Sequence, residues 1–275
     1  MSDAVWHAVV LGALQGITEF LPVSSSAHLI VIPEVLGWPP ASLTFDVAVH
    51  LATALAVFLY FRAEWTAMLS GLWTGVRHTR SLRSPEIRML ALVALATIPA
   101  ALVGWLVQGT FETTLADDPR FAASLSAVLL LVTGGLLLLS ERLGRKALTA
   151  ESIRPRGALG VGLAQAVAIL PGISRSGATI AAGLAGGLRR DEAARFSFLL
   201  AGPIILGASF LQGADAIHTR LPPGEAAAIV AGSLTALVVG YVTIGWFLRY
   251  LRRAPLYLFV AYTWLAGLAF LWWLR

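Results

Sequence analysis

The chain contains no cysteine among its 275 residues, so disulfide bonds, thiolate metal sites and cysteine nucleophiles are excluded. It is also poor in charge, because 13% of its residues are charged, whereas a soluble domain carries about 25%. The mean hydropathy of +0.78 and the 57% share of hydrophobic residues indicate lipid around much of the chain. The composition therefore predicts a single integral membrane domain over residues 1–275.

The net charge of +5 and the isoelectric point near 10.2 would suggest a nucleic-acid partner if the protein were soluble. Here the arginines cluster in loops between apolar runs, which is the pattern of the positive-inside rule and of contact with anionic lipid. We therefore expect membrane lipids as partners and no nucleic acid. Residues 4–14 are apolar but follow no basic segment, so we expect no cleavable signal peptide.

A membrane-spanning helix needs roughly 20 mainly apolar residues. Six runs meet that length, namely Leu43–Phe61, Met89–Val107, Phe121–Leu139, Phe196–Gly213, Ala226–Leu248 and Leu256–Leu274. Two further apolar regions, residues 5–36 and 158–188, are interrupted by proline and by clusters of hydroxyl residues. The sequence thus predicts an all-α polytopic protein of about six spans plus two interrupted regions.

Basic and non-basic loops alternate if each interrupted region enters the membrane and leaves on the same side. The basic loops then all face the cytoplasm. The first interrupted region would open to the outside and the second to the cytoplasm. Residues 64–76 are too few to span and are followed by basic residues, so we expect an interfacial helix. This assignment of loops to the two sides of the membrane rests on the loop charges Arg62, Arg77, Arg80, Arg83, Arg88, Glu112, Asp117, Asp118, Arg120, Arg142, Arg145, Lys146, Arg154, Arg156, Arg189, Arg190, Arg195, Asp215, Glu225, Arg249, Arg252 and Arg253.

The two interrupted regions resemble each other in sequence. GALQGITEFLPVSSSAH begins at Gly12, and GLAQAVAILPGISRSGAT begins at Gly162. In this alignment Gln15 matches Gln165, and three spans follow each region. Opposite orientations of the two halves, approximately 1–141 and 142–275, would form an inverted-topology repeat with two re-entrant helix-loop-helix regions.

The interrupted regions are candidate functional sites because non-helical backbone at membrane depth must be buried in protein or line a wet cavity. Ser24, Ser25 or Ser26 can cap a helix over Leu29–Leu36, and Ser174 or Ser176 can cap one over Ala178–Leu188. Two helix N-termini would then point at a shared cavity, where their N–H groups attract phosphate. Arg175 adds a forked cation suited to phosphate oxygens.

Ionisable residues within membrane segments are functional candidates because burial of their charge is costly. Glu19 and Gln15 are four residues apart and share a helical face. Glu19 could serve the site or pair with Arg175 to hold the halves together. His28 lies three residues after Ser25 and could act on that hydroxyl or serve as an inter-helix hydrogen-bonding residue. Asp46 and His50 lie one turn apart and could line the same cavity or lie at the interface.

The segment QGITEFLPVSSSAH resembles the glutamate-rich signature of the undecaprenyl-pyrophosphate phosphatases, in which E/Q-x-x-x-E precedes L-P-V-S-S-[ST]-[GA]-H. PGISRSGAT resembles the second signature of that family, P-G-x-S-R-S-G, and FDVAVHLATALAVFLYF resembles the segment between them. Gln15 stands where many members carry Glu, Ser26 where Thr is common, and Ala27 where Gly is common.

The resemblance implies hydrolysis of undecaprenyl diphosphate to the monophosphate, recycling of a cell-wall lipid carrier, bacitracin resistance and a bacterial plasma membrane. It implies Glu19, Ser25, His28 and Arg175 as catalytic residues. It also implies a divalent cation, Mg²⁺ or alternatively Ca²⁺, for which Glu19 and Gln15 are the expected ligands. The expected phosphate-binding residues are Ser24, Ser26, Ser174, Arg175, Ser176 and Thr179. A homodimer is a further hypothesis.

Two mechanisms fit these residues. Ser25 could attack phosphorus with His28 as base and form a phosphoserine, or water activated by His28 or Glu19 could attack directly. We expect the cavity to face the periplasm. The competing function is a transporter of polyprenyl phosphate lipid, since inverted repeats around a midplane site are common among transporters. A scaffold without chemistry would gain little from buried charges at Glu19 and Arg175.

Overall fold

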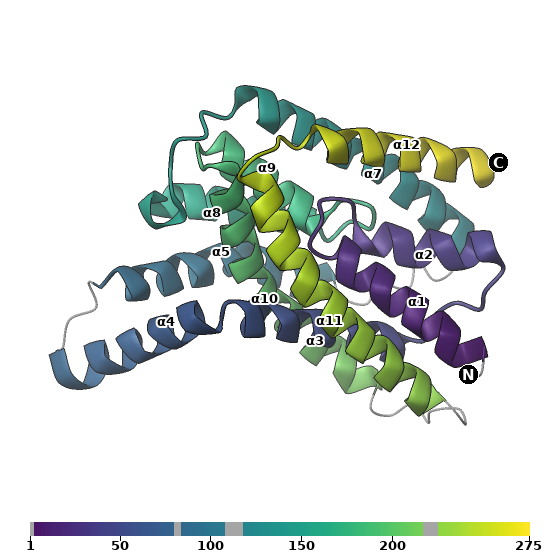
Figure 1. Ribbon diagram of the computed structural model, residues 1–275, viewed down its shortest axis with the longest axis horizontal. Coiled ribbons are helices and arrows are strands. Elements are labelled where there is room, and N and C mark those ends of the chain that lie inside the picture. Colours follow the sequence, from purple (N-terminus) through teal and green to yellow (C-terminus); the bar gives the residue numbers. More distant parts are fainter. Residues whose placement is uncertain (1–2, 80–83, 108–117, 217–224) are drawn as a thin grey trace.

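The computed structural model describes residues 3–79, 84–107, 118–216 and 225–275, and these residues are overwhelmingly helical (Figure 1). Five helices are long and apolar enough to cross a membrane, which confirms five of the six predicted spans. They are α3 (Leu43–Tyr60), α5 (Pro85–Val107), α7 (Pro119–Leu143), α10 (Arg190–Ala216) and α11 (Glu225–Leu251).

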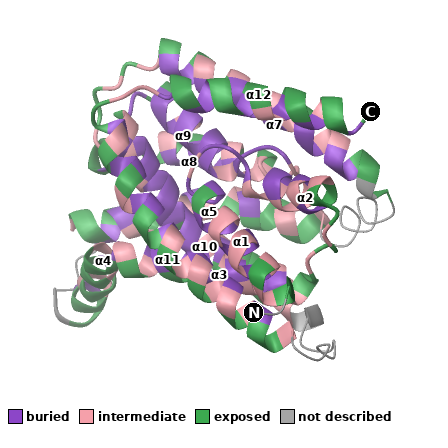
Figure 2. Ribbon diagram, turned by 45° about the vertical axis from the view of Figure 1, so that its right-hand side comes forward, coloured by how far each residue is buried: buried purple, intermediate pink, exposed green. Residues whose placement is uncertain are grey.

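The sixth predicted span forms α12 (Tyr257–Trp273), whose 17 residues lie at the short end of the range of about 17–25 for a spanning helix. Large apolar side chains are exposed along α12, including Leu265, Leu268 and Trp272. Figure 2 shows this exposed side of α12, which packs against α7. Lipid contact is the natural environment for such a surface. The predicted loop charges Arg80, Arg83, Glu112 and Asp117 lie outside the described residues.

Each interrupted region is a helix-loop-helix unit. The first comprises α1 (Asp3–Thr18) and α2 (Ser25–Leu36), and the second comprises α8 (Pro155–Val167) and α9 (Arg175–Ala185). The helix expected to reach Leu188 ends earlier, because Gly187 adopts a φ of +95° that a helix cannot continue through. The path of either unit across a bilayer stays a prediction.

Glycines let the first helix of each unit pack closely on a distant helix. Gly12 on α1 lies against the backbone of Gly232 on α11, and Gly162 on α8 lies against the backbone of Ala96 on α5. A Cβ atom at either glycine would overlap that backbone. Gly12 and Gly162 are the aligned positions of the two similar sequences, so the two units are anchored in the same way.

The remaining helix, α4 (Arg62–Thr74), continues into a π-helical turn over Gly75–Thr79, and it packs against α5 in an arm at one end of the molecule (Figure 1). A helix was predicted here, and its location at a membrane interface stays a prediction. Arg195 ties this arm to the rest of the molecule, since its guanidinium contacts Glu64 at 2.8 Å and Glu151 at 2.5 Å.

Candidate active site

The loops of the two units begin α2 and α9 with equivalent caps. Ser24 caps α2, where its hydroxyl accepts the Ala27 N–H at 3.4 Å. Ser174 caps α9, where its hydroxyl accepts the Gly177 N–H at 3.0 Å. Ser24 has a φ of +65°, a left-handed conformation that is costly for a residue with a Cβ and that recurs at functional sites.

The two loops also complete each other's hydrogen bonding. The Ser26 hydroxyl of the first loop accepts the Gly172 N–H of the second loop at 3.3 Å. Reciprocally, the Ser176 hydroxyl of the second loop donates to the Leu21 carbonyl of the first at 2.9 Å. Ser26 and Ser176 are aligned positions, so the same serine of each loop bonds to the other loop, once as acceptor and once as donor. Both serines, expected to bind phosphate, are therefore engaged in holding the loops together.

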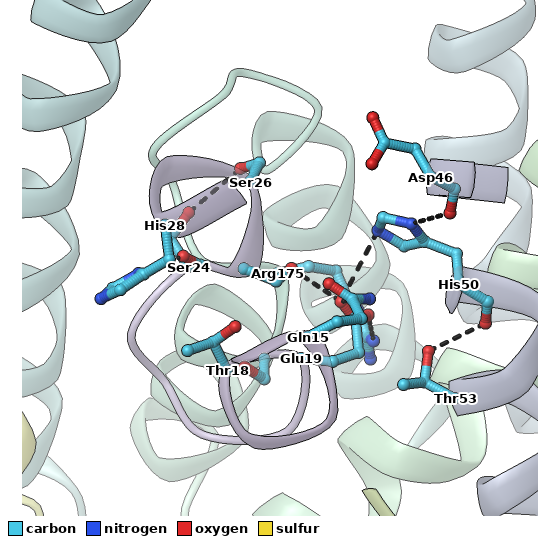
Figure 3. Close-up of polar contacts among 12 residues, drawn as sticks. Gln15, Thr18, Glu19, Ser24, Ser26, His28, Asp46, His50, Thr53 and Arg175 are labelled. Carbon is cyan, nitrogen blue, oxygen red and sulfur yellow. Dashed lines mark hydrogen bonds and ion pairs between the residues drawn. The ribbon is translucent and has the colours of Figure 1, made fainter. Parts of the chain in front are cut away.

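The Glu19 carboxylate is the centre of a charged cluster (Figure 3). Its Oε1 accepts a hydrogen bond from Arg175 Nη2 at 2.6 Å. Its Oε2 accepts from Ser25 Oγ at 2.7 Å and from Gln15 Nε2 at 3.1 Å. Glu19 is 8% exposed and follows a helix end that is anchored by the neighbouring, fully buried Phe20. The cluster thus unites α1, α2 and α9 at one buried carboxylate.

Two helix starts lie beside this carboxylate. Within the described residues, the backbone N–H groups of Ser25 and Ser26 on α2, and of Arg175 and Ser176 on α9, donate to no protein acceptor. The first N–H groups of a helix have no partner within the helix and are suited to an anion. These four backbone groups are therefore available to donate to a bound anion.

Thr179 and Ser197 join α9 to α10. The two hydroxyl oxygens are 2.6 Å apart, and Thr179 Oγ1 also donates to the Arg175 carbonyl at 2.8 Å. Thr179 is fully buried. Its expected role in phosphate binding stays a prediction, while the hydrogen bonds show how it fixes the backbone of Arg175.

His28 and His50 differ in what their rings contact. His28 is 2% exposed, and its Nδ1 donates to the Ser24 carbonyl at 2.8 Å while its Nε2 lies 2.7 Å from the Tyr262 hydroxyl. Figure 3 shows its ring directed away from Glu19. His50 on α3 points toward Glu19, with Nε2 at 3.9 Å from Oε2. The spacing of His28 to Ser25 therefore does not join the two side chains, and its role as a base stays a prediction.

The side-chain oxygen atoms at Glu19 and Gln15 are of the type that bind a hard cation. Gln15 Oε1 is buried and has no hydrogen-bonding partner among the described residues, although the same amide donates to Glu19. An amide oxygen beside a carboxylate is a ligand type that Mg²⁺ and Ca²⁺ accept. The described residues contain no group of three or more acidic, histidine or cysteine side chains placed to hold a metal. A cation here would thus depend on oxygens from substrate and water as well.

These features define a multi-pass α-helical membrane protein whose two helix-loop-helix units enclose a charged cluster. A family model described as bacitracin resistance protein BacA matches residues 8–269, and the chain belongs to this family. The resemblance of its two motifs is thereby confirmed.

Named relatives match along nearly the full chain. An undecaprenyl-diphosphatase of Geobacter sulfurreducens is 44% identical over 263 residues, which cover 96% of each chain. One of Alcanivorax borkumensis is 44% identical over 269 residues and 98% of each chain. One of Rubrobacter xylanophilus is 44% identical over 258 residues and 93% of each chain.

Proposed function

We propose that the chain hydrolyses undecaprenyl diphosphate to undecaprenyl phosphate and inorganic phosphate. The observation that carries the proposal is the Glu19 carboxylate, which binds Ser25 and Arg175 from the two signature motifs. Family membership and the names of the relatives support this substrate. The reaction recycles the lipid carrier of cell-wall synthesis and gives bacitracin resistance, since bacitracin sequesters the diphosphate.

Phosphoryl transfer needs positioning and the neutralisation of spread negative charge. The N–H groups at the starts of α2 and α9 and the Arg175 guanidinium supply donors for the terminal phosphate. Arg175 donates from Nη2 to Glu19 and from Nη1 to the Ser197 carbonyl, which leaves the remaining N–H groups of its guanidinium for phosphate oxygens. The polyprenyl tail stays in the surrounding lipid.

Ser25 is the proposed nucleophile, because its hydroxyl already donates to Glu19 Oε2 at 2.7 Å. In the first step Ser25 Oγ bonds to the terminal phosphorus, and the bond from phosphorus to the bridging oxygen breaks. The serine proton passes to Glu19 and on to the departing lipid monophosphate. In the second step the oxygen of water bonds to phosphorus, the bond to Ser25 Oγ breaks, and the water proton returns to Oγ by way of Glu19.

We assign proton transfer to Glu19 because both ring nitrogens of His28 are already engaged, with Ser24 and Tyr262. A divalent cation, Mg²⁺ or Ca²⁺, would be held by Glu19 and the free Oε1 of Gln15, and when bound it would neutralise phosphate charge. The protein residues orient the phosphate and the nucleophile around it.

For the membrane setting we propose the bacterial inner membrane, an inverted repeat with halves of about 1–141 and 142–275, and a cavity open to the periplasm. The equivalent caps at Ser24 and Ser174 and the equivalent glycine contacts support the repeat. An impermeant thiol reagent should label a cysteine placed at Pro40 in whole cells, and labelling restricted to inverted vesicles would reverse the orientation. A homodimer stays a hypothesis that light scattering in detergent tests.

Phosphate release by purified protein tests the activity. The assay uses a long-chain polyprenyl diphosphate with Mg²⁺ or with a chelator, and it includes Arg175→Ala. Arg252→Ala is the matched control, because Arg252 has a 69% exposed side chain. Cation-dependent release that is lost in Arg175→Ala and kept in Arg252→Ala is the expected result. Folded wild-type protein that releases no phosphate, but moves a labelled lipid phosphate between leaflets, would favour the transporter.

A further inference from the structure

His50 is placed at the charged cluster by α3, a helix that carries neither signature motif. The helix begins at Leu43, and His50 Nδ1 lies 2.7 Å from the carbonyl oxygen of Asp46 one turn earlier. A carbonyl oxygen only accepts hydrogen bonds, so Nδ1 carries the proton of this contact. The ring is thereby fixed in orientation, and in its neutral form Nε2 presents a lone pair.

The lone pair of His50 Nε2 faces an oxygen that is also an acceptor. Glu19 Oε2 is 3.9 Å away, and an ionised carboxylate has no hydrogen to donate. Two acceptors at this separation do not bond each other, but one water molecule lying beside them can donate one of its two hydrogens to each. The His50 side chain is 32% exposed, so a small molecule can reach this point without displacing protein, whereas the 2% exposed His28 is covered.

The same Glu19 oxygen receives the hydroxyl of Ser25 at 2.7 Å. A molecule held by Nε2 and Oε2 therefore lies next to the atom that would carry the phosphoryl group. Water is the small O–H donor required at that place by the second step of the reaction. No other described side chain makes a polar contact with Glu19 beyond Gln15, Ser25, Arg175 and His50.

We propose that His50 is a further catalytic residue, which accepts a hydrogen bond from the attacking water and directs it at the phosphorylated Ser25. This inference rests on the proposed function. The role is that of a fixed acceptor: the water oxygen bonds to phosphorus, the bond from phosphorus to Ser25 Oγ breaks, and the proton travels through Glu19 to Oγ. His50 acts in the second step and leaves the first step unaffected.

The experiment follows single turnovers by rapid quench with diphosphate labelled at its terminal phosphorus. His50→Ala should lower kcat about 10- to 100-fold, because the attacking water loses one of the two acceptors that position it. The burst of lipid monophosphate should keep its wild-type rate, and labelled phosphate should accumulate on Ser25. His50→Gln, whose amide oxygen can accept a hydrogen bond without carrying charge, should recover part of kcat. His7→Gln, on a ring that stacks on Trp38 at 4.0 Å, is the matched control and should behave as wild type.

The outcomes separate the two proposals. Absence of phosphate release from folded wild-type protein rejects the phosphatase itself. Wild-type release with an unchanged kcat in His50→Ala rejects only the role of His50. Equal slowing of burst and turnover, or loss of activity without label on Ser25, also rejects it. A His50→Gln protein as slow as His50→Ala would assign His50 to an ion pair with Glu19, because charge rather than hydrogen bonding would then be required. Gel filtration of each variant shows that it is folded.

Discussion

Removing Arg175 should destabilise the protein more than removing both members of its ion pair. The two side chains are 15% and 7% exposed, and their charged atoms are 2.6 Å apart. Arg175→Ala leaves the Glu19 charge buried without a cation, which costs about 3–5 kcal/mol when one partner of a buried pair is lost. Replacement of a whole buried pair by neutral residues is often neutral or stabilising, by about 1–4 kcal/mol.

The double variant Glu19→Gln with Arg175→Met should therefore be at least about 2 kcal/mol more stable than Arg175→Ala. The amide oxygen that Glu19→Gln introduces can still accept from Ser25, so that contact need not be lost. Unfolding in mixed micelles with increasing SDS measures the free energies. Both variants should lack phosphatase activity, because the phosphate loses the Arg175 guanidinium in each, and the double variant also lacks the carboxylate that takes the serine proton. If Arg175→Ala were as stable as wild type, or the double variant no more stable than the single one, the reasoning that the pair holds the two units together would be wrong.

Further perturbations test packing, pH and cation binding. Gly12→Ala should destabilise the protein by about 1–3 kcal/mol, since its Cβ meets a backbone carbonyl, whereas Gly135→Ala on an open helix face should be neutral or stabilising in the same unfolding assay. Burial raises the pKa of Glu151, but the hydrogen bond and the charge of Arg195, together with hydrogen bonds from its own backbone N–H and from Thr149, outweigh this and hold the pKa below the ordinary 4.5. The stability contributed by this contact is therefore present above pH 4.5 and lost as the pH falls through the lowered pKa. Glu151→Gln should flatten the dependence of the melting temperature on pH in that range. The effect should be small, because the Glu151 side chain is 49% exposed. Gln15→Ala should weaken Mn²⁺ binding measured by electron paramagnetic resonance, and unchanged binding would exclude its amide oxygen as a ligand.

Local sequence signals predicted the helices and their caps well. Hydroxyl residues before an apolar run led to Ser24, Ser25 or Ser26 and to Ser174 or Ser176 as caps, and the structure shows that Ser24 and Ser174 are the ones. The cost of burying charge led to Glu19 and Arg175, and it left open whether they pair or bind phosphate. The structure shows the pair.

Contacts between distant helices could not be predicted in this way. His28 was expected either to act on Ser25 or to form a hydrogen bond between helices, and its ring contacts Tyr262, which is 234 residues away. His50 was expected either to line the cavity or to lie at the interface, and the choice could not be made from the sequence because its contact with Glu19 depends on how α1 packs beside α3. Phosphate binding by Ser26 and Ser176 stays a prediction, and their hydrogen bonds to the opposite loop could not be predicted because they form only when both loops are in place.

The hydrogen bonds exchanged between the two loops make the two halves of the chain resemble the subunits of an obligate heterodimer joined by a linker. Without the other half, the N–H of Gly172 and the carbonyl of Leu21 would each lose a hydrogen-bonding partner. A substitution in one loop therefore affects the other loop as well. For example, a change at Ser26 would remove the acceptor of the Gly172 N–H in the second loop. The charged cluster, drawn from both halves, is complete within one polypeptide.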